Sequence, residues 1–228
     1  MRLDRLIQSS LRMGTREARH FLATRKVKVN GIVETMGNAQ IGYFDRVEAR
    51  GEVLQARTPR YVMLHKPIGV VSATTDLLHQ TVIELIREPW AGELHLAGRL
   101  DRFTSGLVVL TNDGAFSKAL TLPEKKVPKT YLVSTDSDTP PEAVSAFEKG
   151  MPFAKEGVTT EPAIVDQLSP RSCRLTIFEG KHHQVKRMFL RFGIRVVALH
   201  RESVGNLHLN DLAAGMYREL TAEERLVP

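Results

Sequence analysis

The sequence contains very little cysteine and no long apolar run. Its 228 residues include one cysteine, Cys173, which excludes an intramolecular disulfide and a cysteine-based metal cluster. Within SCRLTIF this residue lies in an alternating apolar and polar run, so we expect a small core residue of a strand. No stretch approaches the length of a membrane span, and the N-terminus lacks the apolar segment and cleavage site of a signal peptide. These absences predict a cytoplasmic protein that does not contact a membrane.

Positive charge is concentrated at the start of the chain. The formal net charge is +6, and residues 1–30 hold eight Lys or Arg against two acidic residues. The rest of the chain holds 24 basic and 24 acidic residues and is therefore neutral. A concentrated positive patch favours a polyanion as partner, because binding to phosphates releases counterions. A solvated basic face without a partner is the alternative.

The first 35 residues predict two helices followed by a hairpin. Apolar residues at positions 3, 6, 7 and 11 follow helical spacing, and Met13-Gly14 ends that helix. Thr15 is expected to cap a second helix that buries Ala18, Phe21 and Leu22. The following KVKVNGIVE predicts a hairpin with its turn at Asn30-Gly31. Four cations are then left on the second helix and the loop after it, where they can hold a phosphate backbone: Arg16, Arg19, Arg25 and Lys26.

The rest of the chain predicts a larger α+β domain around a mainly antiparallel sheet. A polar linker is expected over residues 55–60, which gives domain boundaries of 1–58 and 59–228. Beyond it, a helix is expected over 141–150, and strands are expected over 61–64, 107–110, 131–134, 173–178 and 196–199.

One carboxylate stands in an unusual setting. The stretch AGRLDRFTSGLVVLTNDG, residues 97–114, places Asp101 between Arg99 and Arg102, on a loop that leads into a buried strand. A rigid sheet fixes such a loop while leaving it open to substrate, so loops of this kind often carry binding and catalytic groups. The alternative is an exposed ion pair at a turn, which contributes little.

A second informative stretch is EGKHHQVKRMFLRF, residues 179–192. Val185, Met188, Phe189 and Phe192 have helical spacing, so we expect a helix that begins after Gly180 and buries these four side chains. Its other sides carry Lys186, Arg187 and Arg191, and its N-terminus favours an anion.

Metal and nucleotide cofactors find no support in the sequence. Adjacent histidines such as His182 and His183 point in different directions on a helix, and neither has a histidine or carboxylate four residues later. His183 is expected instead to position a loop or to contact RNA. Neither a phosphate-binding G-x-x-x-x-G-K-[ST] loop nor a G-x-G-x-x-G fingerprint is present. We therefore expect no metal and no cofactor.

Two family resemblances follow from these motifs. Residues 1–53, with RLDRLIQ, TREARHFLATRKVKVNG and the basic face, resemble the S4 RNA-binding domain. HKPIG at 65–69, GRLDRFTSGLVVLTNDG at 98–114, KTY at 129–131 and EGKHHQVKRM at 179–188 resemble the four successive motifs of the ribosomal-RNA type of pseudouridine synthases. The chain is similar to the branch that has an N-terminal S4 domain. His65 departs from the family, where this position is often Asn, so its role is left open.

The resemblance implies an activity and roles for several residues. The family isomerises uridine in RNA, and its catalytic aspartate matches Asp101. By the same pattern Lys186 should pair with Asp101, and Arg99 should help to hold the loop. Tyr131 matches the aromatic residue that stacks on the target base, and Arg102 is expected to act as a wedge or to contact a phosphate.

The resemblance also implies the substrate. The expected target is one uridine of small-subunit ribosomal RNA, by resemblance uridine 516 of 16S ribosomal RNA, and the expected enzyme is a monomer. Two alternatives remain open at this point. One is the same chemistry on a uridine of large-subunit, 23S ribosomal RNA. The other is an RNA-binding ribosome-assembly factor without catalytic activity.

Overall fold

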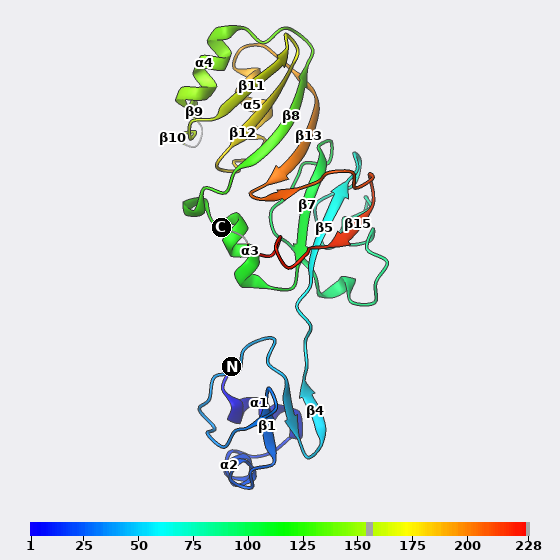
Figure 1. The fold of residues 1–228 in the computed structure, drawn as a ribbon, viewed down its shortest axis with the longest axis vertical. Helices are drawn as coiled ribbons and strands as arrows, with labels where there is room; N and C mark the ends of the chain where they lie inside the picture. The colour runs from blue at the N-terminus through cyan, green and yellow to red at the C-terminus, as the bar shows by residue number, and fades with distance from the viewer. Residues whose placement is uncertain (154–156, 227–228) are drawn as a thin grey trace. The chain divides into compact units, whose positions relative to one another are not determined.

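The computed structural model describes residues 1–153 and 157–226 and divides the chain into two compact units, Met1–Pro59 and Arg60–Pro228 (Figure 1). Residues 154–156 and 227–228 of the predicted 59–228 domain therefore lie outside the described residues. None of the helices in the described part of the chain is long and apolar enough to cross a membrane.

The first unit packs two short helices against a small sheet. Its helices are α1, Leu3–Leu11, and α2, Thr15–Ala23. Its sheet has the strand order β2-β1-β3-β4, with β1 at Val27–Val29, β2 at Ile32–Val33, β3 at Val47–Ala49 and β4 at Glu52–Gln55. One core holds the unit together; it includes the predicted apolar residues of both helices and Val27 and Val47 of the sheet.

The structure confirms the predicted hairpin and corrects the predicted cap. Val29 pairs with Ile32 across the turn, and both central residues have positive φ, 50° at Asn30 and 83° at Gly31. These angles suit the tight turn that Asn-Gly favours, because they match the twist of the two strands. Thr15, however, is the first helical residue of α2, and Gly14 is the N-cap. The Thr15 hydroxyl donates to Gln8 of α1 instead of accepting from a backbone amide of its own helix.

The second unit is built on a mixed, mainly antiparallel sheet. Its nine described strands follow the order β11-β12-β8-β13-β7-β5-β15, with β14 beside β13 and β6 beside β7. Within the described chain, β13 and β7 form the one parallel pair of this sheet. The strands are β5 Tyr61–Lys66, β6 His95–Leu96, β7 Ser105–Thr111, β8 Lys129–Thr135, β11 Ile164–Ser169, β12 Ser172–Ile177, β13 Val196–Val204, β14 Leu207–His208 and β15 Tyr217–Glu219.

Short helices complete the second unit. They are α3 Gly114–Thr121, α4 Pro141–Lys149 and α5 Gln184–Leu190, with single turns η1 Ala91–Glu93 and η2 Pro123–Lys125 and a two-stranded ribbon of β9 Pro152–Phe153 and β10 Val158–Thr159. The aromatic rings of Phe147 in α4 and Phe189 in α5 pack edge to face, 4.9 Å apart. Both side chains are fully buried in the largest core cluster, which fixes α5 against the rest of the unit.

The predicted linker is shorter than expected. Gln55 is the last residue of β4, and its side-chain amide donates to the carbonyls of Gly42 and Asp45. At the other end, the backbone amide of Arg60 donates to the side chain of Asn112. Residues 55 and 60 are therefore held by the first and second unit respectively, and residues 56–59 connect the two.

Candidate active site

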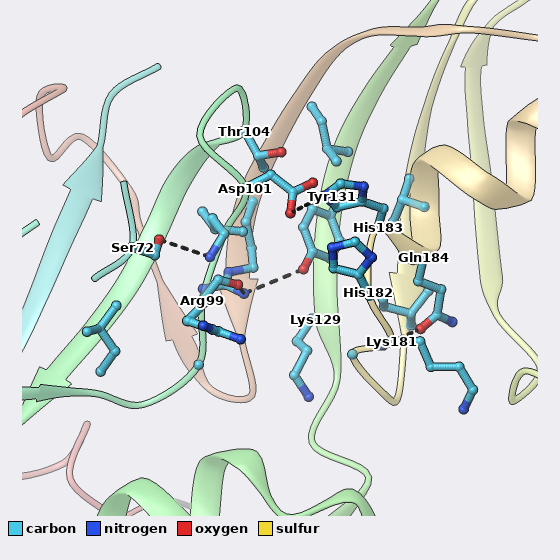
Figure 2. A pocket seen from close by; sticks show the side chains of 18 of the residues that line it. Ser72, Arg99, Asp101, Thr104, Lys129, Tyr131, Lys181, His182, His183 and Gln184 are labelled. Atoms are coloured by element: carbon cyan, nitrogen blue, oxygen red, sulfur yellow. Dashed lines mark hydrogen bonds and ion pairs between the residues drawn. The ribbon is translucent and has the colours of Figure 1, made fainter. Parts of the chain in front are cut away.

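An open pocket of about 1120 Å³ lies in the second unit. Its walls come from the segments 71–74, 95–104 and 177–186 and from side chains of β8 and β13 (Figure 2). Three of the four motif segments seen in the sequence contribute to it, with Asp101, Tyr131 and Lys186 among its lining residues. Folding thus gathers residues that lie far apart along the chain.

Asp101 lies on the loop between β6 and β7, as the sequence predicts. Its carbonyl accepts from the amide of Thr104 at 3.0 Å, which closes a turn just before β7. The carboxylate is 29% exposed and faces two nitrogen atoms: Lys186 Nζ at 3.2 Å and His183 Nε2 at 3.3 Å. The expected ion pair with Lys186 is therefore present. Because both partners belong to the segment 183–186, the carboxylate is held inside the pocket and not by a neighbouring surface arginine.

His183 reaches Asp101 because α5 begins later than predicted. The helix starts at Gln184, and His183 is its N-cap with a left-handed φ of 51°. The imidazole stacks on the ring of His182, with 3.8 Å between the ring centres. In Figure 2, Asp101 and His183 approach each other from opposite sides of the pocket. The contact was not predicted, since a helix starting after Gly180 would have directed this side chain differently.

Helix α5 presents Lys186 by burying its opposite face. Val185, Met188 and Phe189 are buried, as the helical spacing predicts. Phe192 lies beyond the end of the helix and is only partly buried, but its ring packs edge to face on Phe147 of the same core, so its predicted burial is met in part. These side chains pack into the core, and Lys186, whose side chain is 32% exposed, lines the pocket.

A buried lysine holds the Asp101 loop from behind. Lys66, in the HKPIG motif, is fully buried, and its ammonium group donates to the carbonyls of Pro67, Val70 and Arg102 at 2.9, 2.7 and 3.2 Å. Burial lowers the pKa of Lys66 to about 8, while Asp101 opposes this shift and Lys186 adds to it. The lysine therefore joins the turn after β5 to the residue that follows Asp101. No role was predicted for it, although its motif was identified.

Arg201 of β13 is a second buried cation at the pocket. It pairs in register with Tyr131 of β8 and is 3% exposed. Its Nε donates to the carbonyl of Leu107 at 2.8 Å, and its Nη1 lies 3.4 Å from the carbonyl of Arg99 and 3.5 Å from the hydroxyl of Tyr131. Tyr131 itself is 7% exposed, so only a small part of it faces the pocket. Sequence reasoning did not identify Arg201, because no motif or periodicity marks it.

The two arginines beside Asp101 have different surroundings. Arg99 was expected to help hold the loop, but its side chain is exposed and the loop is held through its carbonyl, which accepts from Arg201. A further bond to this loop runs from the amide of Leu100 to the hydroxyl of Ser72 (Figure 2). Arg102 is also exposed, and its guanidinium contacts the carbonyl of Gly69 and the ring of His79, at 3.2 and 2.9 Å.

In the first unit, the four basic residues expected to bind phosphates are all exposed, on α2 and the turn after it: Arg16, Arg19, Arg25 and Lys26.

Cys173 is buried in β12, and burial raises the pKa of its thiol to about 11, which confirms the prediction of a core residue. His65, whose role was open, bonds through Nδ1 to the carbonyl of Leu212. Across residues 1–153 and 157–226, no group of three His, Cys, Asp or Glu is placed to hold a metal ion.

Comparison with known proteins gives consistent matches. Residues 60–191 match the family model described as RNA pseudouridylate synthase. The chain is 44% identical over 226 residues to a protein of Pseudomonas aeruginosa named ribosomal small subunit pseudouridine synthase A, and 42% identical to the protein of that name from Escherichia coli K12. Both alignments cover 98% of each chain. A crystal structure described as a pseudouridylate synthase superposes with a TM-score of 0.72 at 37% identity, covering 99% of this chain and 98% of that one.

Proposed function

Since the chain belongs to the RNA pseudouridylate synthase family, we propose that it converts one uridine of small-subunit ribosomal RNA to pseudouridine and that Asp101 is the catalytic residue. In finer detail, the proposed position is uridine 516 of 16S ribosomal RNA. The observation that carries the catalytic assignment is the position of the Asp101 carboxylate between Lys186 and His183 inside a large open pocket.

The reaction sets clear requirements for this carboxylate. The bond between the sugar C1′ and the base N1 breaks, the base turns, and C1′ joins C5; C5 loses a proton and N1 gains one. The atoms are conserved and nothing is oxidised, so the isomerisation is balanced without a co-substrate. Asp101 can begin it by attacking the sugar, by attacking the base or by removing a sugar proton. Each of these steps needs a carboxylate oxygen at the sugar or the base, and Lys186 and His183 fix the carboxylate of Asp101 in the pocket.

The pocket also suits an extruded nucleoside. A uridine inside a stem is out of reach of Asp101, so it must leave the base stack before it can react. Tyr131 is proposed to contact the extruded base, and stacking on an aromatic ring contributes about 1–3 kcal/mol per base. Arg99 and Arg102 are exposed at the same pocket and are proposed to contact the RNA that surrounds the target.

We assign RNA affinity to the first unit, as an S4-like domain. Arg16, Arg19, Arg25 and Lys26 are exposed together on α2 and the following turn, which supports a role in binding phosphates. Such contacts position a protein on RNA without reading its sequence. The choice of the uridine would then depend on the pocket in the second unit.

The experiment that tests this proposal is direct. The purified protein is incubated separately with unmodified 16S and 23S ribosomal RNA, and pseudouridine is mapped at single-nucleotide resolution. We expect one new pseudouridine in 16S RNA and none in 23S RNA. Product in 23S RNA alone would overturn the substrate assignment, and RNA binding without any product would support a non-catalytic assembly factor.

A further inference from the structure

Among the described residues, two cations at the pocket have no carboxylate partner. Arg201 and Lys129 both line it, and within the described part of the chain no acidic side chain lies within 4 Å of their nitrogen atoms. Their hydrogen bonds go to neutral acceptors. For Lys129 the acceptor is the carbonyl of Val127, at 2.7 Å. Two positive charges without a nearby negative group form an unusual arrangement, because Arg201 is 3% exposed and buried charges are normally paired.

The two side chains face a common space. Lys129 is two residues before Tyr131 on β8, so both side chains leave the strand on the same face. Arg201 lies opposite Tyr131 on the neighbouring strand β13. The pKa of Lys129 is lowered, first by burial and then by the positive charge of Arg201. Figure 2 shows Lys129 below Tyr131, between the labelled Arg99 and Lys181.

Both cations have donors left for a ligand. An ammonium group has three N–H donors and a guanidinium has five. Lys129 uses one donor for Val127, and Arg201 uses Nε and Nη1 for its contacts. Arg201 Nη2 makes no hydrogen bond to any described residue, but it is not completely buried. Arg201 lines the pocket, from which a small part of it is accessible.

We propose that Lys129 and Arg201 form a phosphate-binding site on the β8–β13 wall of the pocket, which takes one phosphodiester group next to the target uridine. The inference rests on the proposed function, because it places this phosphate beside the base that Tyr131 contacts. A phosphate oxygen would accept charge-assisted hydrogen bonds from both cations and would offset their mutual repulsion. The site would thereby fix the position of the sugar relative to Asp101.

The test combines a protein change with a change in the RNA. Two ribosomal RNA fragments carry a neutral methylphosphonate in place of the phosphate on the 5′ or the 3′ side of the target uridine. We expect wild-type kcat/KM to fall about tenfold or more on one of the two fragments, the size of a lost charge-assisted contact. Lys129→Met should show a similar loss on natural RNA, mainly through KM, and should lose little more on that same fragment.

Controls separate binding from folding. Lys149→Met removes an exposed cation at the end of α4, away from the pocket lining, and should keep the wild-type response to both fragments. Arg201→Lys should keep more activity than Arg201→Gln, with thermal unfolding of each variant measured alongside. If the kcat/KM of Lys129→Met falls as much as that of wild-type on each methylphosphonate fragment, the proposed phosphate-binding site is contradicted. Absence of product from wild-type protein on natural RNA would instead overturn the proposed function.

Discussion

The carboxylate of Asp101 lies 3.2 Å from the ammonium of Lys186, although 85 positions separate the two residues in the chain. Asp101 belongs to the loop before β7, and Lys186 belongs to α5. The distance depends on burial of the opposite face of α5 and on the bonds that Lys66 and Arg201 make to the loop. Several independent contacts thus fix one ion pair at the pocket.

The first prediction concerns this ion pair. Lys186→Met should lower kcat by about tenfold, because the ionised carboxylate loses a charge-assisted hydrogen bond. Lys186→Arg should be less affected, since it keeps the positive charge. Single-turnover rates on 16S ribosomal RNA measure the effect. A matched control is Lys126→Met, which breaks the exposed Lys126–Glu161 pair at 3.1 Å and should leave the rate unchanged. Equal rates for wild-type and Lys186→Met would contradict the assignment.

The second prediction concerns RNA affinity. Reversal of two exposed charges, Arg16→Glu together with Arg19→Glu, should weaken binding to ribosomal RNA, because phosphate contacts are lost. The slope of log affinity against log salt should become shallower by about one for each contact removed. Binding measured over a salt series tests this, with Lys149→Glu in the second unit as control. An unchanged slope would show that α2 does not contact phosphates.

The third prediction uses the buried ammonium of Lys66. Its pKa is lowered from 10.5 to about 8 in the folded protein, so between these pH values the unfolded chain binds more protons than the folded chain. The contribution of this group to the free energy of unfolding therefore rises with pH across that window.

Urea unfolding of the wild-type protein and of Lys66→Met over a pH series isolates this contribution. The free energy of unfolding of wild-type minus that of the variant should increase from about pH 8 towards pH 10.5 and should be flat below pH 7. Cys173 titrates identically in both proteins and cancels from the difference. A difference that is constant or falls across the window would rule out a depressed pKa for Lys66.

The fourth prediction concerns the contact between β7 and β13. Gly106 has a φ of +112°, and a Cβ atom there would lie 2.3 Å from the carbonyl oxygen of Arg201 and 2.5 Å from its amide nitrogen. Because these are backbone atoms, Gly106→Ala must move a strand as well as adopt a strained φ. We expect a loss of about 3 kcal/mol or more in the free energy of unfolding. Gly92→Ala, where a Cβ meets nothing within 4 Å, should cost far less. Similar stability of the two variants would contradict the tight β7–β13 approach.

Local structure was well predicted where short-range chemistry decides it. The run Leu107–Leu110 is completely buried in β7, and the helix expected over 141–150 is α4, Pro141–Lys149. Strand β11, Ile164–Ser169, was missed. Its residues are mostly exposed and it is held at the sheet edge by pairing with β12, so no apolar pattern marks it.

The candidate site was predicted unevenly for physical reasons. Asp101 was singled out by its setting between two arginines before a buried strand, but its catalytic role and the roles of Tyr131 and Lys186 came from resemblance to family motifs. No periodicity brings together residues so far apart. Lys66 and Arg201 were missed because such residues are usually exposed. Their burial here depends in part on carbonyls of distant segments, that of Arg102 for Lys66 and that of Leu107 for Arg201. The contact of His183 with Asp101 depends on a left-handed residue at the start of α5, which propensity does not reveal.

The most direct measurement is pseudouridine mapping after incubation of 16S ribosomal RNA with excess wild-type protein or excess Asp101→Asn. The amide has the shape of the carboxylate but cannot ionise, so folding and RNA affinity should be kept while no pseudouridine forms. Asp138→Asn, which changes an exposed partner of Arg171, serves as the matched control and should remain active. Pseudouridine formed by Asp101→Asn at the wild-type rate would show that this carboxylate does not perform the chemistry.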